Sequence, residues 1–557
     1  MFQTIAIIGG VAAGPSAAVK ARRCDEESRI VIFEKDKYVS YGSCGFPFYV
    51  SGTISDMDRL IFNTSDTFKK RYNIDVLVKH EVKEIEPEKK RLKVLDINSN
   101  ELKTFSYDKL LIATGARAII PPIDGIDLPH IYILRTVEDV EKIKSFILSE
   151  KPKKAVVVGG GLIGLEMVEA FLERKLEVTV VEMLDQILPN FDWEMARPME
   201  KHLADIGVKL ILSDAVKRFE GDKEGVKKVI TKSGTEIPAD IVLLSVGVRP
   251  NTELARQAGI ELGVRNTIKV NERMETNIED IFAAGDCVES VHLVTGKPTW
   301  APMGSVANKQ GRVAGENMTG RDSRFKGVLG TCITKVFDFK AAKTGLSEAE
   351  ARSQGFDISV SYVHPYDLLH CYPGASSITM KMITDSKSQR ILGAQIVGKG
   401  GVDKRVDVIA TAILAGFKNS DLFHIDLAYA PPFSPAKDPA IIAGMVSENE
   451  YKGDVKVILP SELKRRMDSG DDFLLLDVRT LKEFESYHLK GAKLVHVDEL
   501  RERLNELEPF KAKEIVVYCK TGIRSYRACR ILMNKGFKDV KNLTGGLSMW
   551  NFDVEKK

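Results

Sequence analysis

The chain has 557 residues, which at about 150 residues per domain predicts three or four domains. Apolar residues make up 44% of it and charged residues 29%, as is usual for a globular protein. The 81 basic and 78 acidic residues leave a net charge of +3, which argues against nucleic acid or a membrane surface as the main partner.

No segment approaches the roughly 18 consecutive apolar residues that a membrane span needs, and no basic segment precedes the first apolar run. A cytoplasmic location is therefore expected. The seven cysteines are widely spaced and include no C-x-x-C pair, so neither a disulfide framework nor a metal site is expected. In a reducing compartment, a catalytic thiol is the favoured role for a cysteine.

Residues 4–36 predict a strand, a glycine-rich turn, a helix and a second strand that ends in an acid. In such a βαβ unit, glycines let the backbone approach a pyrophosphate at the helix N-terminus, and the acid binds a ribose hydroxyl. Val11 stands where the middle glycine of the pattern is expected. The expected cofactor-binding residues are Gly9, Gly10, Ala13, Gly14 and Glu34.

The next notable segment is Ser40-Tyr-Gly-Ser-Cys44-Gly-Phe-Pro-Phe, which holds one cysteine and no C-x-x-x-x-C pair. A single thiol cannot close an internal disulfide, so its oxidised form must be capped by an external sulfur or by oxygen. The alternative is that Cys44 is a small buried hydrophobic residue.

Residues 153–184 repeat the βαβ plan with a complete G-x-G-x-x-G, whose glycines are Gly159, Gly161 and Gly164. Two such units predict two dinucleotides and hydride transfer between them. Glu182 at the end of the second strand favours NADH, although Lys175 leaves NADPH open. Residues 110–115 and 280–286 each predict a buried strand that ends in a polar turn.

With these motifs, residues 1–446 resemble the single-cysteine branch of the flavoprotein disulfide reductases, which includes coenzyme A disulfide reductases, NADH oxidases and NADH peroxidases. The resemblance implies FAD in the first site, NAD(P)H in the second, and a redox-active Cys44 next to the flavin. Asp286 would bind the ribityl chain of FAD. The further cofactor contacts that it implies are Lys35, Thr114, Gly115 and Gly247.

The resemblance to coenzyme A disulfide reductase also implies a coenzyme A site, with the cofactor as a candidate bound ligand. Its substrate-binding positions would be Ser16, Lys20, Arg23, Ser40, Ser43, Arg71 and Lys437. A solvated basic helix face is an equally open interpretation of the first helix. Tyr429 and Lys437 match residues that relatives supply to the active site of the partner subunit, which implies a homodimer. Cys371 stands where relatives have a tyrosine, and whether the adjacent Tyr372 replaces it stays open.

A polar segment, 447–457, predicts a linker to a further domain of about 100 residues. That domain contains Tyr518-Cys519-Lys-Thr-Gly-Ile-Arg524-Ser525 after a predicted buried strand and resembles a rhodanese domain. Cys519 would carry a persulfide, stabilised by backbone N–H groups and by Arg524. A phosphatase-like use of the same loop is the competing interpretation.

The expected fold is α/β: two Rossmann-like dinucleotide-binding domains, an α+β dimerisation domain and a C-terminal α/β rhodanese domain. The expected boundaries are 1–150 and 276–326 for the FAD domain, 151–275 for the NAD(P)H domain, 327–446 for dimerisation, 447–457 for the linker and 458–557 for the rhodanese domain.

The expected activity is reduction of CoA persulfide, CoA polysulfide or CoA disulfide through Cys44, with sulfane sulfur relayed by Cys519. The alternatives are an NADH oxidase or peroxidase that uses a Cys44 sulfenic acid, and a sulfur-carrier or redox-sensing flavoprotein. The sulfur donor and acceptor, and the route of sulfur from Cys519 to Cys44, are left open by the sequence.

Overall fold

The computed structural model describes residues 3–556 and contains two compact units. The first comprises Met1–Pro189 and Leu203–Gly330, and the second comprises Asn190–His202 and Thr331–Lys557. The segment 190–202 therefore leaves the first unit and belongs to the second.

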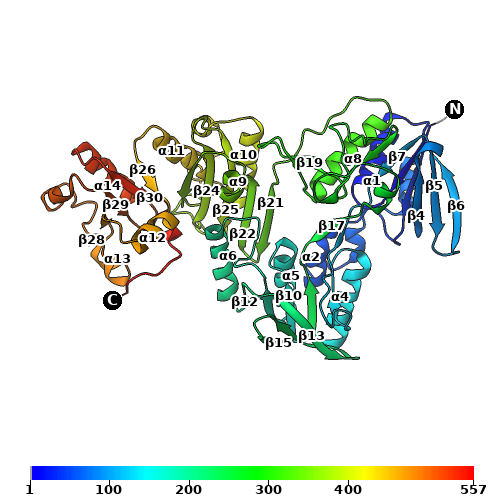
Figure 1. Cartoon of the computed structure of the whole chain (residues 1–557), viewed down its shortest axis with the longest axis horizontal. Helices are drawn as coiled ribbons and strands as arrows, with labels where there is room; N and C mark the ends of the chain where they lie inside the picture. The colour runs from blue at the N-terminus through cyan, green and yellow to red at the C-terminus, as the bar shows by residue number, and fades with distance from the viewer. Residues whose placement is uncertain (1–2, 557) are drawn as a thin grey trace. The chain divides into compact units, whose positions relative to one another are not determined.

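A five-stranded parallel sheet carries the first glycine-rich turn (Figure 1). Its strands are, in spatial order, β18 (Ile281–Ala283), β7 (Lys109–Ile112), β1 (Thr4–Ile8), β2 (Arg29–Glu34) and β3 (Asp75–Val78). Alternate side chains of β1 belong to different hydrophobic clusters, Ile5 and Ile7 to one, and Ala6 and Ile8 to the other. Both faces are thus buried, which explains the continuous apolar run in the sequence.

Helix α1 (Ala13–Cys24) packs closely on α8 (Gly304–Met318) because α8 has glycine at two contact positions. A Cβ at Gly311 would collide with the carbonyl of Ala13, and a Cβ at Gly315 would collide with the carbonyl of Ala17. The close approach brings residues of α8 next to the polar side of α1, although α1 precedes α8 by nearly 300 positions in the chain.

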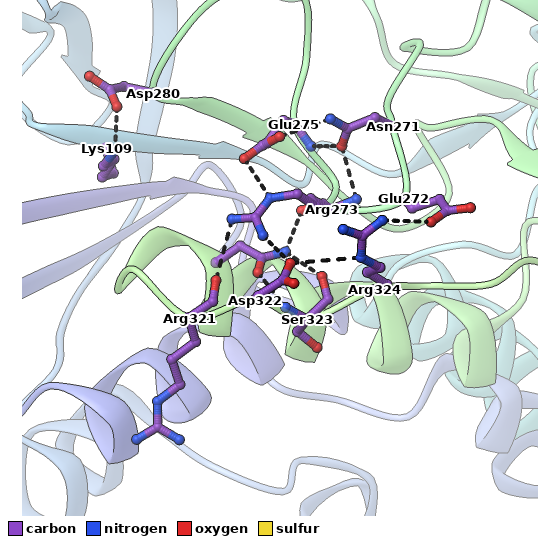
Figure 2. Close-up of polar contacts among 11 residues, drawn as sticks. Lys109, Asn271, Glu272, Arg273, Glu275, Asp280, Arg321, Asp322, Ser323 and Arg324 are labelled. Carbon is purple, nitrogen blue, oxygen red and sulfur yellow. Dashed lines mark hydrogen bonds and ion pairs between the residues drawn. The ribbon is translucent and has the colours of Figure 1, made fainter.

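The turn that follows α8 contacts the segment 271–275, which precedes β18, through polar side chains shown in Figure 2. The Arg273 guanidinium donates to Glu275 at 3.0 Å and also pairs with Asp322. The Arg324 guanidinium pairs with Glu272 at 3.4 Å. These contacts tie the residues that follow α8 to the segment 271–275.

A second parallel sheet carries the second glycine-rich turn. Its order is β12 (Lys209–Ile211), β11 (Glu177–Val181), β10 (Lys154–Val158), β16 (Ile241–Leu244) and β9 (Ile131–Tyr132), with α4 (Val137–Glu150) and α5 (Leu162–Glu173) as its long helices. Smaller sheets complete the first unit: β4 (His80–Glu86), β5 (Arg91–Asp96) and β6 (Glu101–Ser106); β13 (Val216–Asp222), β14 (Gly225–Thr231) and β15 (Glu236–Pro238); β17 (Val248–Pro250) with β8 (Ala116–Ala118); and β19 (Ser290–Val291) with β20 (Pro298–Thr299). Short helices of this unit are α2 (Phe46–Ser51), α3 (Ser65–Tyr72) and α7 (Glu253–Gln257).

The second unit contains one antiparallel and one parallel sheet. The antiparallel order is β21 (Cys332–Val336), β22 (Phe339–Gly345), β25 (Ile391–Gly398), β24 (Ile378–Asp385) and β23 (Ile358–Val363), accompanied by α6 (Trp193–Asp205), α9 (Glu348–Ser353), α10 (Val402–Leu414) and α11 (Pro439–Tyr451). The parallel order is β26 (Lys456–Ile458), β30 (Val540–Leu543), β29 (Ile515–Tyr518), β27 (Leu474–Asp477) and β28 (Lys493–Leu494), with α12 (Pro460–Asp468), α13 (Leu481–Ser486) and α14 (Ile523–Asn534). The predicted α/β fold class is confirmed.

The segment expected to be a linker is partly helical, because α11 continues to Tyr451. Ser447 is buried, and its hydroxyl accepts a hydrogen bond from the Asn419 amide at 3.1 Å. Burial raises the pKa of Glu450 to about 7. Residues 447–451 are therefore the end of a helix with Ser447 buried, while the boundaries of the linker stay a prediction.

Lys381, a fully buried residue of β24, joins the segment 190–202 to the antiparallel sheet. Its ammonium lies 2.8 Å from Asp192, 2.5 Å from Glu194 and 2.8 Å from Glu348. Burial opposes the charge, yet the Tyr362 oxygen and the three carboxylates hold the pKa of Lys381 well above its usual value. The three carboxylates have the spacing of a metal site, but the lysine ammonium is the cation among them.

Among residues 3–556, no helix is both long and apolar enough to cross a membrane.

Candidate functional site

The two glycine-rich turns have the same local geometry. Gly9 and Gly159 follow the central strands with φ of +106° and +105°, a region that only glycine enters without strain. The N–H of Gly10 donates to the Glu34 carboxylate at 2.7 Å, and the N–H of Gly160 donates to Glu182 at 2.8 Å. Each turn is thereby tied to the acid at the end of the following strand.

The glycines differ in how strictly they are required. A Cβ at Gly14 would collide with the carbonyl of Gly9, and a Cβ at Gly164 would collide with that of Gly159. At Gly161, by contrast, a Cβ would meet nothing within 4 Å. This explains why the first turn can hold Val11 at the corresponding position.

These residues fit two dinucleotides. Helices α1 and α5 begin directly after the turns, and neither has a side chain that caps its first N–H groups, which leaves them available to a pyrophosphate. Glu34 and Glu182 are almost fully buried, and burial raises the pKa of Glu34. Their carboxylate oxygens retain further lone pairs for ribose hydroxyls. Lys35, by contrast, points to solvent.

The predicted flavin contacts gather at the ends of β7 and β18. Asp286 pairs with Arg135, with 2.6 Å between their oxygen and nitrogen. The Thr114 hydroxyl donates to the carbonyl of Asn251 at 2.6 Å, and Gly115 has a φ of +66°. Arg135 was not predicted, because no motif surrounds it and only the fold brings it to Asp286.

Gly247, predicted on the nicotinamide side, has a φ of +111° and accepts a hydrogen bond from the N–H of Ile119 at 3.0 Å. This bond joins the start of β17 to the end of β8. The position requires glycine, while its role toward a cofactor stays a prediction.

Cys44 is exposed and lies in a single helical turn just before α2, which packs against α5. Partial desolvation of the sulfur raises the pKa of Cys44. The carboxylates of Glu166 and Asp286 raise this pKa further, whereas Arg135 lowers it. Glu166 is on α5, and Asp286 is among the flavin residues. The thiol is therefore within electrostatic reach of both nucleotide sites.

A cavity of about 360 Å³ has Ser40, four residues before Cys44, in its wall. Among its lining residues are four that were predicted to bind substrate, Ser16, Lys20, Arg23 and Ser40. Ser43 and Arg71 do not line it. Three lining side chains are cationic, Lys20, Arg23 and Arg312, so the cavity suits an anionic group.

Several lining residues were missed by the sequence reasoning. Asn308 accepts from the Ser16 hydroxyl at 2.5 Å, and Arg312 lies one turn further along α8. Glu316, a further turn on, pairs with Lys20 at 2.6 Å and thereby lowers its own pKa. No local motif could have indicated α8, because only its close packing on α1 brings it to this cavity.

The remaining predicted residues of the first family resemblance lie in the second unit. Tyr372, Tyr429 and Lys437 are all exposed, as is Cys371. Their predicted roles in a shared active site stay predictions.

Cys519 follows β29 and is fully buried. Its sulfur accepts from the N–H of Gly522 at 3.1 Å and from the Ser525 hydroxyl at 3.4 Å. Gly522 has a φ of +95° and is the N-cap residue of α14. Hydrogen bonds from these donors strengthen when the sulfur is negative, which suits a thiolate or a terminal persulfide sulfur.

Arg524 is shared between this loop and α13. Its guanidinium donates two hydrogen bonds of 2.7 Å to the Glu483 carboxylate. This pair lowers the pKa of Glu483 to about 2. The sequence predicted a cation near Cys519, but the structure shows that its charge is balanced by a carboxylate.

Comparisons with known proteins agree with this arrangement. Residues 3–308 match the pyridine nucleotide-disulphide oxidoreductase family, residues 331–441 its dimerisation domain, and residues 459–553 the rhodanese-like domain.

Three relatives illustrate the similarity. The crystal structure of reduced Bacillus anthracis CoADR-RHD has a TM-score of 0.96 and 39% identity, covering 99% of this chain and 98% of that one. An NAD-dependent persulfide reductase from A. fulgidus has a TM-score of 0.91 and 43% identity, covering 98% and 100%. An NAD(P)H sulfur oxidoreductase (CoA-dependent) from Pyrococcus abyssi is 39% identical over 445 residues, covering 80% of this chain and 98% of the relative. The chain belongs to the coenzyme A disulfide/persulfide reductase family of NAD(P)H-dependent flavoproteins, in the form that carries a C-terminal rhodanese domain.

Proposed function

We propose that this enzyme uses NADH to reduce coenzyme A persulfide, coenzyme A polysulfide or coenzyme A disulfide at Cys44. The observation that carries the proposal is one exposed thiol within electrostatic reach of Glu166 on α5 and of Asp286, four residues after Ser40 in the wall of a cationic cavity. Coenzyme A carries phosphates at one end and its sulfur at the other, so a cavity for the phosphates close to a reactive thiol suits it.

Cys44 would act as a nucleophile. Its thiolate attacks the coenzyme A sulfur of CoA disulfide or CoA persulfide, so that the S–S bond breaks and CoA thiolate or hydrosulfide leaves. Both substrates leave the same mixed disulfide between Cys44 and coenzyme A. Two electrons and one proton then restore the Cys44 thiolate and release CoA thiol. Bound FAD would supply these electrons after accepting a hydride from NADH.

The protein's own residues would bind and orient the two dinucleotides. The Gly9–Gly14 and Gly159–Gly164 turns would hold the two pyrophosphates, and Glu34 and Glu182 the ribose hydroxyls. The preference for NADH over NADPH rests on Glu182, since the next residues, Met183 and Leu184, are exposed and supply no cation for a 2′-phosphate.

Cys519 would load sulfane sulfur onto coenzyme A. Its thiolate attacks the sulfane sulfur of a donor such as polysulfide, and a Cys519 persulfide forms as the rest of the donor leaves. A CoA thiolate then takes the terminal sulfur, so that CoA persulfide forms and the Cys519 thiolate returns. Gly522 and Ser525 hold the charge on sulfur in both states.

A homodimer is part of the proposal, because residues 331–441 match a dimerisation domain. Tyr429, Tyr372 and Lys437 would then reach the active site of the other subunit. Their exposure in the single chain is compatible with such a role.

The test is flavin reoxidation in protein reduced anaerobically with NADH. CoA persulfide, CoA disulfide, inorganic polysulfide and oxygen are added in separate runs, and thiol and sulfide are measured. Fast reoxidation by a CoA-linked substrate with release of thiol or sulfide supports the proposal. A fast response to oxygen or peroxide alone would instead assign an oxidase or peroxidase.

A further inference from the structure

Phe62 is a large aromatic residue that the fold leaves 65% exposed beside the Cys44 segment. It follows Ile61, which pairs with Tyr41 in an antiparallel bridge, and it precedes Asn63, which lines the cationic cavity. A single exposed apolar residue needs no explanation by itself. The residues around Phe62 are what point to a role for it in substrate binding.

The backbone fixes where the ring lies. The N–H of Phe62 donates to the carbonyl of Ser40 at 2.7 Å, and the N–H of Gly42 donates to the carbonyl of Leu60 at 2.8 Å. A Cβ on Gly42 would lie 2.9 Å from the Cζ atom of Phe62. The tip of the ring therefore covers Gly42, and the absence of a side chain at that position makes room for it.

The ring lies against Gly42, which stands in the chain between the cavity residue Ser40 and the reactive Cys44. Ser40 and Asn63 are both in the cavity wall and are joined by a hydrogen bond of 3.3 Å from the Asn63 amide to the Ser40 hydroxyl. Cys44 follows Gly42, the residue that the ring covers, by two positions. A substrate with its phosphates in the cavity and its sulfur at Cys44 extends along the segment from Ser40 to Cys44, which the ring partly covers at Gly42.

We propose that Phe62 is a specificity-determining residue whose ring receives the pantetheine arm of coenzyme A. The inference rests on the proposed function and adds the residue that selects for the arm itself. The arm carries methylene and methyl groups and two planar amides, which pack on an aromatic face and lose water-exposed apolar surface as they do. Phe62 would thus align the sulfur with Cys44 without taking part in bond making.

The experiment compares three disulfides in single turnovers of NADH-reduced enzyme. CoA disulfide has both nucleotide and arm, pantethine has the arm without the nucleotide, and cystamine has only the cysteamine end of the arm, without its amides and methyl groups. The second-order rate constant is read from thiol release and from the mass of the Cys44 peptide. In Phe62→Ala we expect about a five- to tenfold loss for CoA disulfide and for pantethine, since a lost apolar contact of this size is worth about one power of ten. The rate constant for cystamine should change by less than about twofold.

Two further variants separate this role from a general effect on folding. Leu102→Ala removes another exposed apolar side chain, 59% accessible on β6, and should leave all three rates unchanged. Gly42→Ala pushes the ring aside and should reproduce the loss for CoA disulfide. In the Phe62→Ala background it should add nothing, because the ring is already gone.

An equal loss for cystamine, an unchanged CoA disulfide rate in Phe62→Ala, or additive effects of Gly42→Ala and Phe62→Ala would each overturn the inference. Failure of the proposed function looks different: wild-type enzyme would not release thiol from CoA disulfide, or Cys44→Ser would still do so.

Discussion

Cys44 and Cys519 are both candidate sulfur nucleophiles, and the protein surrounds them in opposite ways. Cys44 is exposed, and its surroundings, including two carboxylates, raise its pKa. Cys519 is fully buried and accepts hydrogen bonds from a backbone N–H and a hydroxyl. The surroundings of Cys44 leave the thiol accessible but disfavour its thiolate, whereas Cys519 is enclosed and its sulfur is held by two hydrogen-bond donors.

The largest expected effect separates the two thiols by function. Cys44→Ser should abolish CoA disulfide reduction, by about a thousandfold or more, because no other nucleophile replaces the thiolate. Cys519→Ser should leave CoA disulfide reduction within about twofold and impair NADH oxidation driven by polysulfide with coenzyme A. The measurement is NADH consumption with each substrate. An equal loss of CoA disulfide turnover in Cys519→Ser would contradict separate roles.

A change in electron donor sharpens the same comparison while both thiols stay intact. Glu182→Ala with Met183→Arg removes the carboxylate that repels a 2′-phosphate and adds a cation, so the ratio of kcat/KM for NADPH over NADH should rise by about tenfold or more. Sulfur transfer from polysulfide to Cys519 needs no nicotinamide and should be unaffected. Lys175→Ala is the matched control, and a larger shift in that variant would mean that Lys175, not Glu182, sets the preference.

Removing one donor tests the buried site. Ser525→Ala deletes the hydroxyl that donates to the Cys519 sulfur, and persulfide formation at Cys519 should slow by about three- to tenfold, as expected for one hydrogen bond to a charged group. Mass spectrometry of the Cys519 peptide gives the rate. Ser548→Ala is the control, since its hydroxyl donates to the carbonyl of Lys520 and not to the sulfur. Similar slowing in both variants would point to loop disruption.

The smallest effect tests the exposed site. A thiol is protonated below its pKa, and the Glu166 carboxylate raises the pKa of Cys44, so Glu166→Gln should lower that pKa and increase the thiolate fraction at neutral pH. Alkylation of the Cys44 peptide by iodoacetamide, followed against pH in reduced enzyme, should shift to lower pH and accelerate by about two- to threefold at pH 7. Glu173→Gln, at the exposed end of α5, should leave the profile unchanged. A shift to higher pH would contradict the electrostatic assignment.

Much of the fold was predictable because its signals are local. The glycine turns and their acids follow from short-range geometry, and the buried parallel strands appear as continuous apolar runs. The structure also explains the one irregularity, Val11, through the open space at Gly161.

The parts that escaped prediction depend on contacts between distant segments. Asn308 and Arg312 join the cavity only because glycines in α8 allow it to approach α1. Arg135 meets Asp286 across about 150 positions, and Glu483 neutralises Arg524 from a different helix. The helical continuation of α11 through residues 447–451 also has no local signal, since the polar composition of this segment suits a helix end as well as a linker.

The Lys381 cluster has a consequence for the order in which the chain can fold during synthesis. Asp192 and Glu194 emerge from the ribosome nearly two hundred residues before the lysine that neutralises them. Until β24 has been made, these carboxylates have to stay hydrated, because burying them without Lys381 would cost several kcal/mol, about 3–5 for a broken buried pair. The segments on either side, up to Pro189 and from Leu203, can meanwhile complete the first unit. The segment 190–202 therefore lacks its packing partners until the second unit has been made. A nascent chain stopped at residue 330 would expose this segment to proteases and chaperones.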